Sequence, residues 1–554
     1  MAGTTWRDPP RAMAEQLDTD KLNDLPPEPA KGLLHSSALV GGATLVSRVL
    51  GLVRDVVLAN LVGATSNADA FFVAFKIPNF LRRLFAEGAF AQAFIPVLTE
   101  TREQGGLAAV RALVDRVTGV LGGVLILLTT ATILAAPLVA LVFAPGFSND
   151  PGKLSLTADL IRITFPYLFL ISMTGFAGGI LNAYGRFGVP AFTPVLLNLS
   201  LIAAALYLAP VLEEPVYALA LGVMLAGLLQ LLFQIPSLYG LELIPRPRWD
   251  TKHPGVKRIL TLMVPALFGV SVSQINLLLD TVLASLLPAG SVSWLYYSDR
   301  LTELPLGIFA IAVATVILPN LSSQQARATA ADQSPAFVAT LHWALGLIVL
   351  VAVPATAALV LLAKPILTTL FQYGAFSPGD VDKAAWSLRA YALGLTAFML
   401  IKVLAPGYYA RQDMKTPVRI GVIAMVANMV MNPIFIFPLM WLFDLGHVGL
   451  ALATSVAAWL NAGLLYRGLR RKGLLLGVTR FRLARAAHIV IAIMIMLGVL
   501  WLCLPEAGWW RGAVAIHRGL AMAVLVMLGG LAYGVTLWCL GLRLRDLKSP
   551  TVSL

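Results

Sequence analysis

The chain has 554 residues, of which 58% are hydrophobic and only 12% are charged, and its mean hydropathy is +0.82. This composition excludes an ordinary soluble domain and is typical of a protein that crosses a membrane many times. A net charge of +13 would suggest nucleic-acid binding in a soluble protein. Here the basic residues concentrate in loops, so we expect no nucleic-acid partner.

Cysteine and histidine give no sign of a metal or disulfide framework. The two cysteines lie in separate apolar segments and the six histidines are scattered along the chain. Neither set shows the spacing of metal ligands, so no metal site is expected.

Residues 1–35 are polar and Pro-rich and lack the apolar core of a signal peptide, which predicts a disordered cytoplasmic tail. From residue 37 onward, apolar segments long enough to cross the hydrocarbon core recur about fourteen times. The sequence therefore predicts an all-α polytopic membrane protein.

The first predicted span, 37–62, contains Arg48, Arg54 and Asp55. Each Arg or Lys at the centre of a span costs about 2.5 to 3.5 kcal/mol when it faces lipid, so these charges should face a polar interior. At 100° per residue Arg48 and Asp55 share a face, while Arg54 points elsewhere, toward the cytoplasm or a lobe interface.

The second predicted span, 68–98, also contains charged residues that should face a polar interior. Lys76, Arg83 and Glu87 fall on one face of the helix, and Arg82 lies one position round from it. Pro78 predicts a kink within this span. A bent helix beside a polar cavity is the simplest structure that satisfies these residues.

The chain repeats itself at an offset of about 224 to 230 residues, which spans six helices. The run 71–76 matches 295–300, and Asn198 aligns with Asn428. Because the two lobes have the same orientation, we expect a pseudo-twofold axis along the membrane normal to relate them, with a central cavity between the lobes. The predicted divisions are an N-lobe at 36–240, a C-lobe at 255–472 and two added helices at 482–543.

The second lobe brings its own charges to this cavity. They are Asp280, Asp299, Arg300, Glu303 and Lys402. A mainly cationic cavity indicates a transporter for an anionic substrate, because guanidinium groups match the oxygens of phosphate. The alternative is that these charges are internal ion pairs, such as Arg54 with Asp55 or Arg83 with Glu87, that hold helices together.

An enzyme is the competing class, for example a membrane transferase acting on lipid diphosphates. Its support is the Asp-x-Asp pattern of Asp380, Val381 and Asp382. The pattern is short, and no HExxH, GxSxG or P-loop motif accompanies it. We therefore expect a transporter rather than an enzyme.

The loops predict the orientation. Loops after even-numbered spans are basic, as at 246–258 and 467–485, whereas those after odd-numbered spans include uncharged runs such as GATSNA and PAGSV. By the positive-inside rule, the basic loops and both termini are cytoplasmic.

Four motifs make the chain similar to a known family. They are SRVLGLVRD (47–55), DAFFVAFKIPNFLRRLFAEGAFAQAFIP (69–96), GSVSWLYYSDRLTELPLGIF (290–309) and KVLAPGYYARQDMKTPV (402–418). On these residues the chain resembles the MurJ (MviN) family of lipid II flippases, in the multidrug/oligosaccharidyl-lipid/polysaccharide exporter superfamily. The resemblance runs from about residue 36 to the C-terminus.

The resemblance implies alternating access that moves an undecaprenyl-diphosphate-linked peptidoglycan precursor from the cytoplasmic to the periplasmic leaflet of the bacterial inner membrane. It implies that Arg48, Arg54 and Arg300 contact the head group and that Lys76, Arg82 and Arg83 support the cavity or gate. The charges expected to support or gate the site are Asp55, Asp69, Glu87, Asp299, Glu303 and Lys402. The two added helices would form a groove for the lipid tail.

The partners expected on this basis are lipid II, membrane lipids and proteins of cell-wall synthesis, with no cofactor. A coupling cation could bind Asp280, Asp299, Glu303 or Asn432, or the membrane potential could act directly on the charges, and the spacing of these residues does not decide between the two. The alternative substrate is another polyprenyl-linked glycan or a drug.

Overall fold

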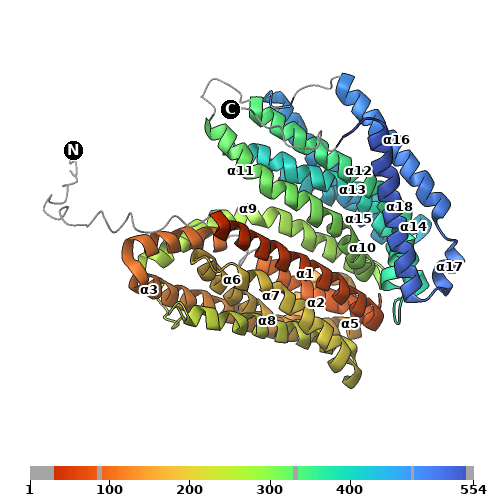
Figure 1. Ribbon diagram of the computed structural model, residues 1–554. Helices are drawn as coiled ribbons and strands as arrows, with labels where there is room; N and C mark the ends of the chain where they lie inside the picture. Colours follow the sequence, from red (N-terminus) through yellow and green to blue (C-terminus); the bar gives the residue numbers. More distant parts are fainter. Residues whose placement is uncertain (1–29, 84–89, 328–334, 476–479, 544–554) are drawn as a thin grey trace.

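The computed structural model describes residues 30–83, 90–327, 335–475 and 480–543, and every regular element within these ranges is helical. Figure 1 shows the helices as two bodies, with α16 to α18 along the outer side of the second. The all-α expectation is confirmed. Most of the predicted tail and Glu87 lie outside the described residues.

The first body contains eight α-helices. They are α1 (Ala30–Val62), α2 (Ser66–Arg82), α3 (Phe90–Leu134), α4 (Ala136–Phe143), α5 (Pro151–Thr164), α6 (Tyr167–Ala183), α7 (Gly188–Ala203) and α8 (Pro215–Tyr239). Gly106 interrupts α3 with a φ of 64°, so α3 consists of two helices joined at a bend.

The second part of the chain begins with α9 (Pro254–Ser285) and ends with a separate group of three helices. The elements after α9 are α10 (Ser291–Pro305), the π-helical turn η6 (Leu306–Ala310), α11 (Ile311–Arg327), α12 (Pro335–Phe371), α13 (Pro378–Tyr409), α14 (Lys415–Phe443), α15 (Gly446–Arg471), α16 (Arg480–Cys503), α17 (Ala507–Gly512) and α18 (Ala515–Cys539). The last three pack on α12.

Within the described residues, eleven helices are long and apolar enough to cross a membrane. Large apolar side chains such as Leu134, Leu502 and Trp441 are more than three-quarters exposed, as expected where lipid rather than water covers the protein. The chain is therefore a multi-pass membrane protein, and the count of fourteen spans stays a prediction, as do the lobe boundaries.

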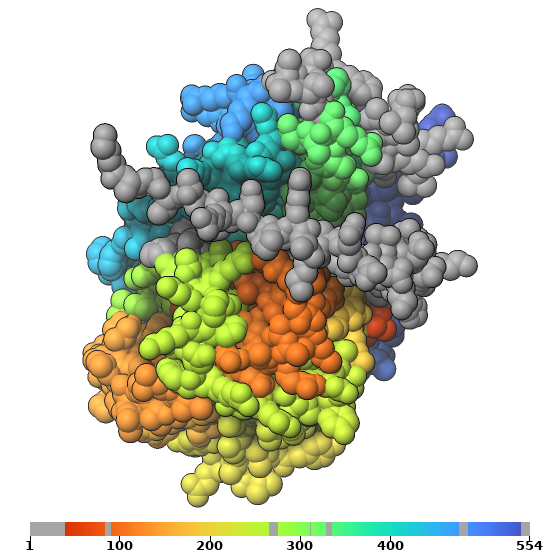
Figure 2. All heavy atoms as spheres, turned by 90° about the vertical axis from the view of Figure 1, so that its left-hand side faces the viewer, coloured from red at the N-terminus to blue at the C-terminus, as the bar shows by residue number. Residues whose placement is uncertain are grey.

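Helix α9 belongs to both bodies. Val256 and Ile259, near its start, lie in a buried cluster with Leu113 and Val117 of α3, whereas its later turns pack against α14. Figure 2 shows the first part of the chain, red to lime, in the lower half of the molecule and the green-to-blue remainder above it. Helix α9 thus packs within both bodies.

Polar contacts fix the loop that precedes α9. Asp115 of α3 accepts a hydrogen bond from the Arg246 backbone N–H at 2.7 Å, and its carbonyl accepts one from the Arg248 N–H at 3.0 Å. Arg116 pairs with Asp250 at 3.1 Å, and this hydrogen bond lowers the pKa of Asp250. The loop therefore stays attached to α3.

Lys472, just after α15, closes the turn between α13 and α14 in a similar way. Its Nζ donates to Asp413 at 2.6 Å, and Thr416 donates to the same carboxylate through its N–H and hydroxyl. The Lys472 hydrogen bond lowers the pKa of Asp413 from 3.8 to about 2. Because the folded pKa is depressed, this contribution to stability is present at neutral pH and is lost as the pH falls through that range.

Helices α14 and α15 approach closely through glycine. A Cβ added at Gly449 would lie 2.7 Å from the backbone nitrogen of Ile436, whereas one added at Gly463, on the same helix, would meet no atom within 4 Å. Small residues at such crossings allow membrane helices to gain packing contacts.

We expect Gly449→Ala to lower the thermal unfolding temperature of the purified protein, because the two backbones must separate. The matched control Gly463→Ala should be neutral or raise it, since alanine favours a helix over glycine by about 1 kcal/mol. Equal effects of the two substitutions on thermal unfolding would show that this crossing is not tightly packed.

Candidate functional site

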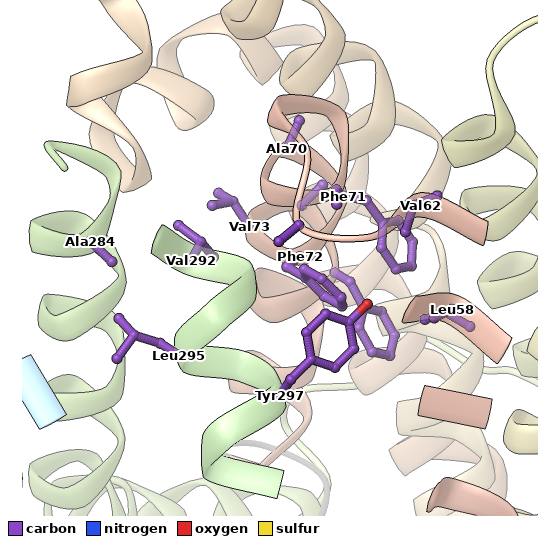
Figure 3. Packing of buried hydrophobic residues seen from close by; sticks show 14 of the residues in the cluster. Leu58, Val62, Ala70, Phe71, Phe72, Val73, Ala284, Val292, Leu295 and Tyr297 are labelled. Carbon is purple, nitrogen blue, oxygen red and sulfur yellow. The ribbon is translucent and has the colours of Figure 1, made fainter. Parts of the chain in front are cut away.

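Residues that the repeat makes equivalent touch each other between α2 and α10. Asp69 accepts hydrogen bonds from Ser293, 224 residues away. Phe72 stacks on Tyr296, at the same separation, with ring centroids 4.1 Å apart. Figure 3 shows Phe72 beside Tyr297, with which it makes an edge contact. Because equivalent positions meet where a twofold axis crosses an interface, the pseudo-axis passes between these helices.

A buried ion pair lies beside this axis. Arg54 donates to Asp55 Oδ1 from Nε at 3.0 Å and from Nη2 at 2.6 Å. The two residues are 6% and 2% exposed. The Tyr296 hydroxyl donates to the same carboxylate oxygen at 3.0 Å and accepts from Arg54 at 3.1 Å. The pair therefore links α1 to α10 across the lobe interface.

Asn198 of α7 completes the shell of Arg54. Its side-chain oxygen accepts from Arg54 Nη1 at 3.0 Å, and its amide nitrogen donates to the Ser47 carbonyl at 2.9 Å. Helical periodicity separates Arg54 from the face of Asp55, yet the long side chain turns back to it. The expected position at the lobe interface agrees with this arrangement.

Arg300 extends the network to a partly exposed position. Its Nε lies 3.8 Å from Asp55 Oδ2, its Nη1 donates to Glu303 at 2.9 Å, and its guanidinium lies 5.1 Å from the centre of the Tyr296 ring. About a third of its side chain is exposed. Arg300 can therefore contact a ligand while the carboxylates hold it in place.

Arg48 is also half-buried, and it packs on the π-helical turn η6. A Cβ added at Gly307 would lie 1.7 Å from Arg48 Nη1. Only a residue without a side chain leaves room for the guanidinium here. Such π-helical turns occur frequently at functional sites.

The remaining predicted charges of α2 are grouped less tightly. Lys76 interacts electrostatically with Asp280, Asp299 and Arg83, and Arg82 donates to Asn79 at 3.4 Å. Asp299 lies within electrostatic range of Glu303, Arg300, Lys76 and Arg83. Lys402, on α13, is exposed and forms no ion pair with the described residues. The structure thus brings most predicted charges to one region between α1, α2, α9 and α10.

Asp69 joins the lobes at one end of the bundle. Its Oδ1 accepts from the Ser293 N–H at 3.0 Å and hydroxyl at 2.7 Å, and its Oδ2 accepts from the Gly290 N–H at 2.7 Å and from Lys153 at 3.2 Å. An acidic side chain here caps the first turn of α10 from the opposite lobe. We call this contact the Asp69 latch.

A backbone contact lies at the same end as the latch. The Ala375 N–H donates to the Asn60 carbonyl at 2.9 Å, and Gly63 and Gly374 have φ values of 58° and 52° where the two segments touch. A side chain at either glycine would collide with backbone atoms. This end of the bundle, with the latch and these glycines, is the closed end.

A second polar cluster lies inside the C-lobe. Asp280 accepts from Asn432 at 3.1 Å and from Thr454 at 3.4 Å, and Asn432 donates to Asn428 at 3.2 Å. Helices α9, α14 and α15 therefore meet around one carboxylate. In the described part of the chain, no group of three His, Cys, Asp or Glu side chains has the arrangement of a metal site.

The Asp-x-Asp pattern serves the fold. Asp380 forms the capping box of α13 with Ser377 and accepts from the Trp294 indole at 2.8 Å. Asp382 pairs with Lys364. Both carboxylates bind donors within the protein. The pattern therefore does not support a diphosphate-binding site of a transferase.

Several residues of the site were not predicted from the sequence. They are Lys153, Asn198, Ser293, Tyr296 and Gly307. The repeat held the best signal for two of them, because Ser293 and Tyr296 stand at the positions equivalent to Asp69 and Phe72. Gly307 gave no signal, since a glycine that accommodates a distant arginine looks like any other glycine.

We expect Asp69→Asn to lower the thermal stability of the purified protein strongly. The change leaves Lys153 buried without its charged partner, a situation that costs about 3 kcal/mol or more. Asp159→Asn is the matched control, because it breaks the exposed pair with Arg162 and should cost under about 1 kcal/mol. Similar unfolding temperatures for the two variants would contradict the latch.

Comparison with known proteins places the chain in a family. Residues 58–512 match the family model described as lipid II flippase MurJ. The chain is 50% identical to a probable lipid II flippase MurJ of Vibrio cholerae over 94% of this chain and 99% of that one. It is 42% identical to a lipid II flippase MurJ of Burkholderia cenocepacia, over 92% and 98%.

Solved structures with a similar fold include a member of the same family. A lipid II flippase MurJ in an inward closed conformation superposes with a TM-score of 0.74 at 25% identity, over 90% of this chain and 98% of that one. A multidrug resistance MATE family transporter of the MOP superfamily superposes with a TM-score of 0.62 at 14% identity, over 79% and 98%, and shares the fold alone. The family is one of transporters rather than enzymes, and the chain belongs to the MurJ family of lipid II flippases.

Proposed function

We propose that this protein moves lipid II from the cytoplasmic to the periplasmic leaflet of the inner membrane. The observation that carries the proposal is the network of Arg54, Asp55, Tyr296 and Arg300, which lies between the lobes beside the pseudo-axis. Membership of the MurJ family identifies lipid II as the substrate. The network supplies cationic groups at the place where the two lobes must separate.

The orientation follows from charge. Basic residues such as Arg248, Arg419 and Arg470 flank one end of the helices, and the closed end is the opposite one. By the positive-inside rule the basic end faces the cytoplasm and the closed end faces the periplasm. Both termini are then cytoplasmic, and the substrate enters from the side on which lipid II is made.

Arg48 and Arg300 are the groups that we assign to the diphosphate. Both are partly exposed, and a planar guanidinium can donate two parallel hydrogen bonds to phosphate oxygens. Arg54 is enclosed by Asp55 and Asn198 in this conformation. It therefore acts by positioning Asp55 and Tyr296, and reaches the head group only when the lobes move.

Exchange of partners at Asp55 connects binding to movement. The carboxylate neutralises Arg54 directly and Arg300 at longer range. A bound diphosphate would satisfy Arg300 instead and so weaken one contact across the lobe interface. Ligand binding would then shift the equilibrium between the conformation described here and one that is open at the Asp69 latch. The size of the shift is set by the difference between the ligand's affinities for the two conformations.

The lipid tail has an apolar route along the added helices. Leu362 of α12 packs with Ile493 and Leu500 of α16 and Leu525 of α18, and the outer faces of both helices carry exposed apolar residues. Moving a polyprenyl chain from such surroundings into water is unfavourable, because its apolar surface would become hydrated. We therefore propose that the tail stays in contact with this surface while the head group crosses.

We expect Arg300→Ala and Arg48→Ala to abolish the appearance of lipid II at the outer face of the inner membrane in cells depleted of the wild-type protein. Arg300→Lys should lose at least about tenfold in rate, because an ammonium cannot make the paired contact. Arg162→Ala, on the exposed surface of α5, is the control. Wild-type transport by both alanine variants, at normal membrane levels, would contradict the site.

Gly307→Ala tests the position of Arg48. The new methyl group would collide with the flexible end of Arg48 rather than with backbone, so the protein should insert and fold but place its guanidinium wrongly. We expect reduced lipid II exposure at unchanged thermal stability. Gly346→Ala, where a Cβ meets no atom within 4 Å, is the control, and equal activity of the two variants would show that Arg48 does not need this position.

A further inference from the structure

A cavity of about 270 Å³ lies between the C-lobe and the added helices. Its walls come from the last turns of α12, the first turns of α13 and the segment that joins α16 to α17. All three segments are at the closed end. The head-group site does not include this cavity. The cavity shares Leu361, Leu504 and Trp510 with the apolar cluster of the added helices, but its lining also carries charges.

The charged residues among its lining are mostly basic. They are Lys364, Arg389, Arg511 and Asp382. Lys364 pairs with Asp382, so that the charges of Arg389 and Arg511 remain in excess. Arg389 uses Nε to donate to the Val360 carbonyl at 3.3 Å and lies 4.8 Å from the centre of the Trp386 ring. Its position is therefore fixed, and Arg511 is exposed at α17.

Trp510 places a buried indole N–H beside the cavity. It lines the same cavity and is only 4% exposed, yet its indole N–H has no acceptor among the described residues. Buried tryptophan N–H groups usually find a hydrogen-bond partner. The nitrogen has almost no accessible surface here, so the indole must turn before an oxygen atom of a ligand in the cavity can accept from it.

The cavity lies beside the first third of α13, at the closed end of the bundle. Arg389 lies eleven residues after the first residue of α13, or roughly 16 Å along the helix axis. Trp386 and Trp509 are exposed nearby at 49% and 40%, as tryptophans are at membrane interfaces. Leu361, Leu504 and Pro505 provide apolar wall beside the charges, which suits a molecule with both a phosphate and carbon chains.

We propose that this cavity is a phosphate-binding site that takes the head-group phosphate of an anionic phospholipid. Two fixed or exposed guanidinium groups and one indole N–H would donate to the phosphate oxygens. The apolar wall would contact the first carbons of the acyl chains. The bound lipid would then bridge α12 and α13 to α17 and hold the added helices against the C-lobe.

The test measures binding to the full-length protein in a neutral detergent by native mass spectrometry. The probes are dioctanoyl phosphatidylglycerol, dioctanoylglycerol, which lacks phosphate, and inorganic phosphate as a competitor. The variants are Arg511→Gln and Trp510→Phe, which removes the N–H and keeps the ring. Arg162→Gln is the control, because it removes a cation at the same end of the other lobe.

We expect each cavity variant to bind phosphatidylglycerol about tenfold more weakly, the loss of one charge-assisted hydrogen bond, and the control to bind as the wild type does. Failure of inorganic phosphate to compete would identify the lipid as the source, and competition would identify free phosphate as a ligand of the same site. Wild-type affinity in both cavity variants, or equal binding of dioctanoylglycerol, would overturn the proposal. Because binding is measured directly, the result does not depend on flipping.

Discussion

The structure depends on the burial of ions within an apolar protein. Asp55 is almost fully enclosed, and its charge is tolerable only because Arg54 and Tyr296 donate hydrogen bonds to it from two lobes and Arg300 adds a positive charge 3.8 Å away. Removing either arginine, or separating the lobes, would take away part of the positive charge or hydrogen bonding that stabilises the Asp55 carboxylate. In the proposed function, substrate binding and lobe movement would act on the same small set of contacts, which would couple them physically.

Duplication gives this interface its complementarity. Where a pseudo-twofold axis crosses an interface, equivalent positions meet, and two identical charged residues would repel. The two halves have diverged at these positions, so that Asp69 meets the hydroxyl and N–H of Ser293, and Phe72 meets the ring of Tyr296. The latch is thus an acceptor in one lobe and donors in the other.

The two ends of the bundle are connected by different means. At the closed end, the lobes meet through hydrogen bonds of Asp69 and close backbone approaches, which water can replace when the lobes part. At the basic end, α9 and the preceding loop remain attached to α3 through Asp115 and buried contacts of Val256. The lobes are therefore joined by hydrogen bonds and backbone contacts at one end and by buried packing of a helix at the other.

The sequence by itself determined the all-α membrane class, the internal repeat and the presence of charges within apolar segments, because hydropathy, repeats and the cost of charge in lipid are properties of local composition. The motifs shared with the family indicated the substrate. Only the tertiary structure decided that Arg54 turns back to Asp55, that Asn198 encloses it and that Gly307 leaves room for Arg48. Helical periodicity fixes the direction of a Cα–Cβ bond, but a long side chain can bend away from it, and its partners come from helices more than a hundred residues distant.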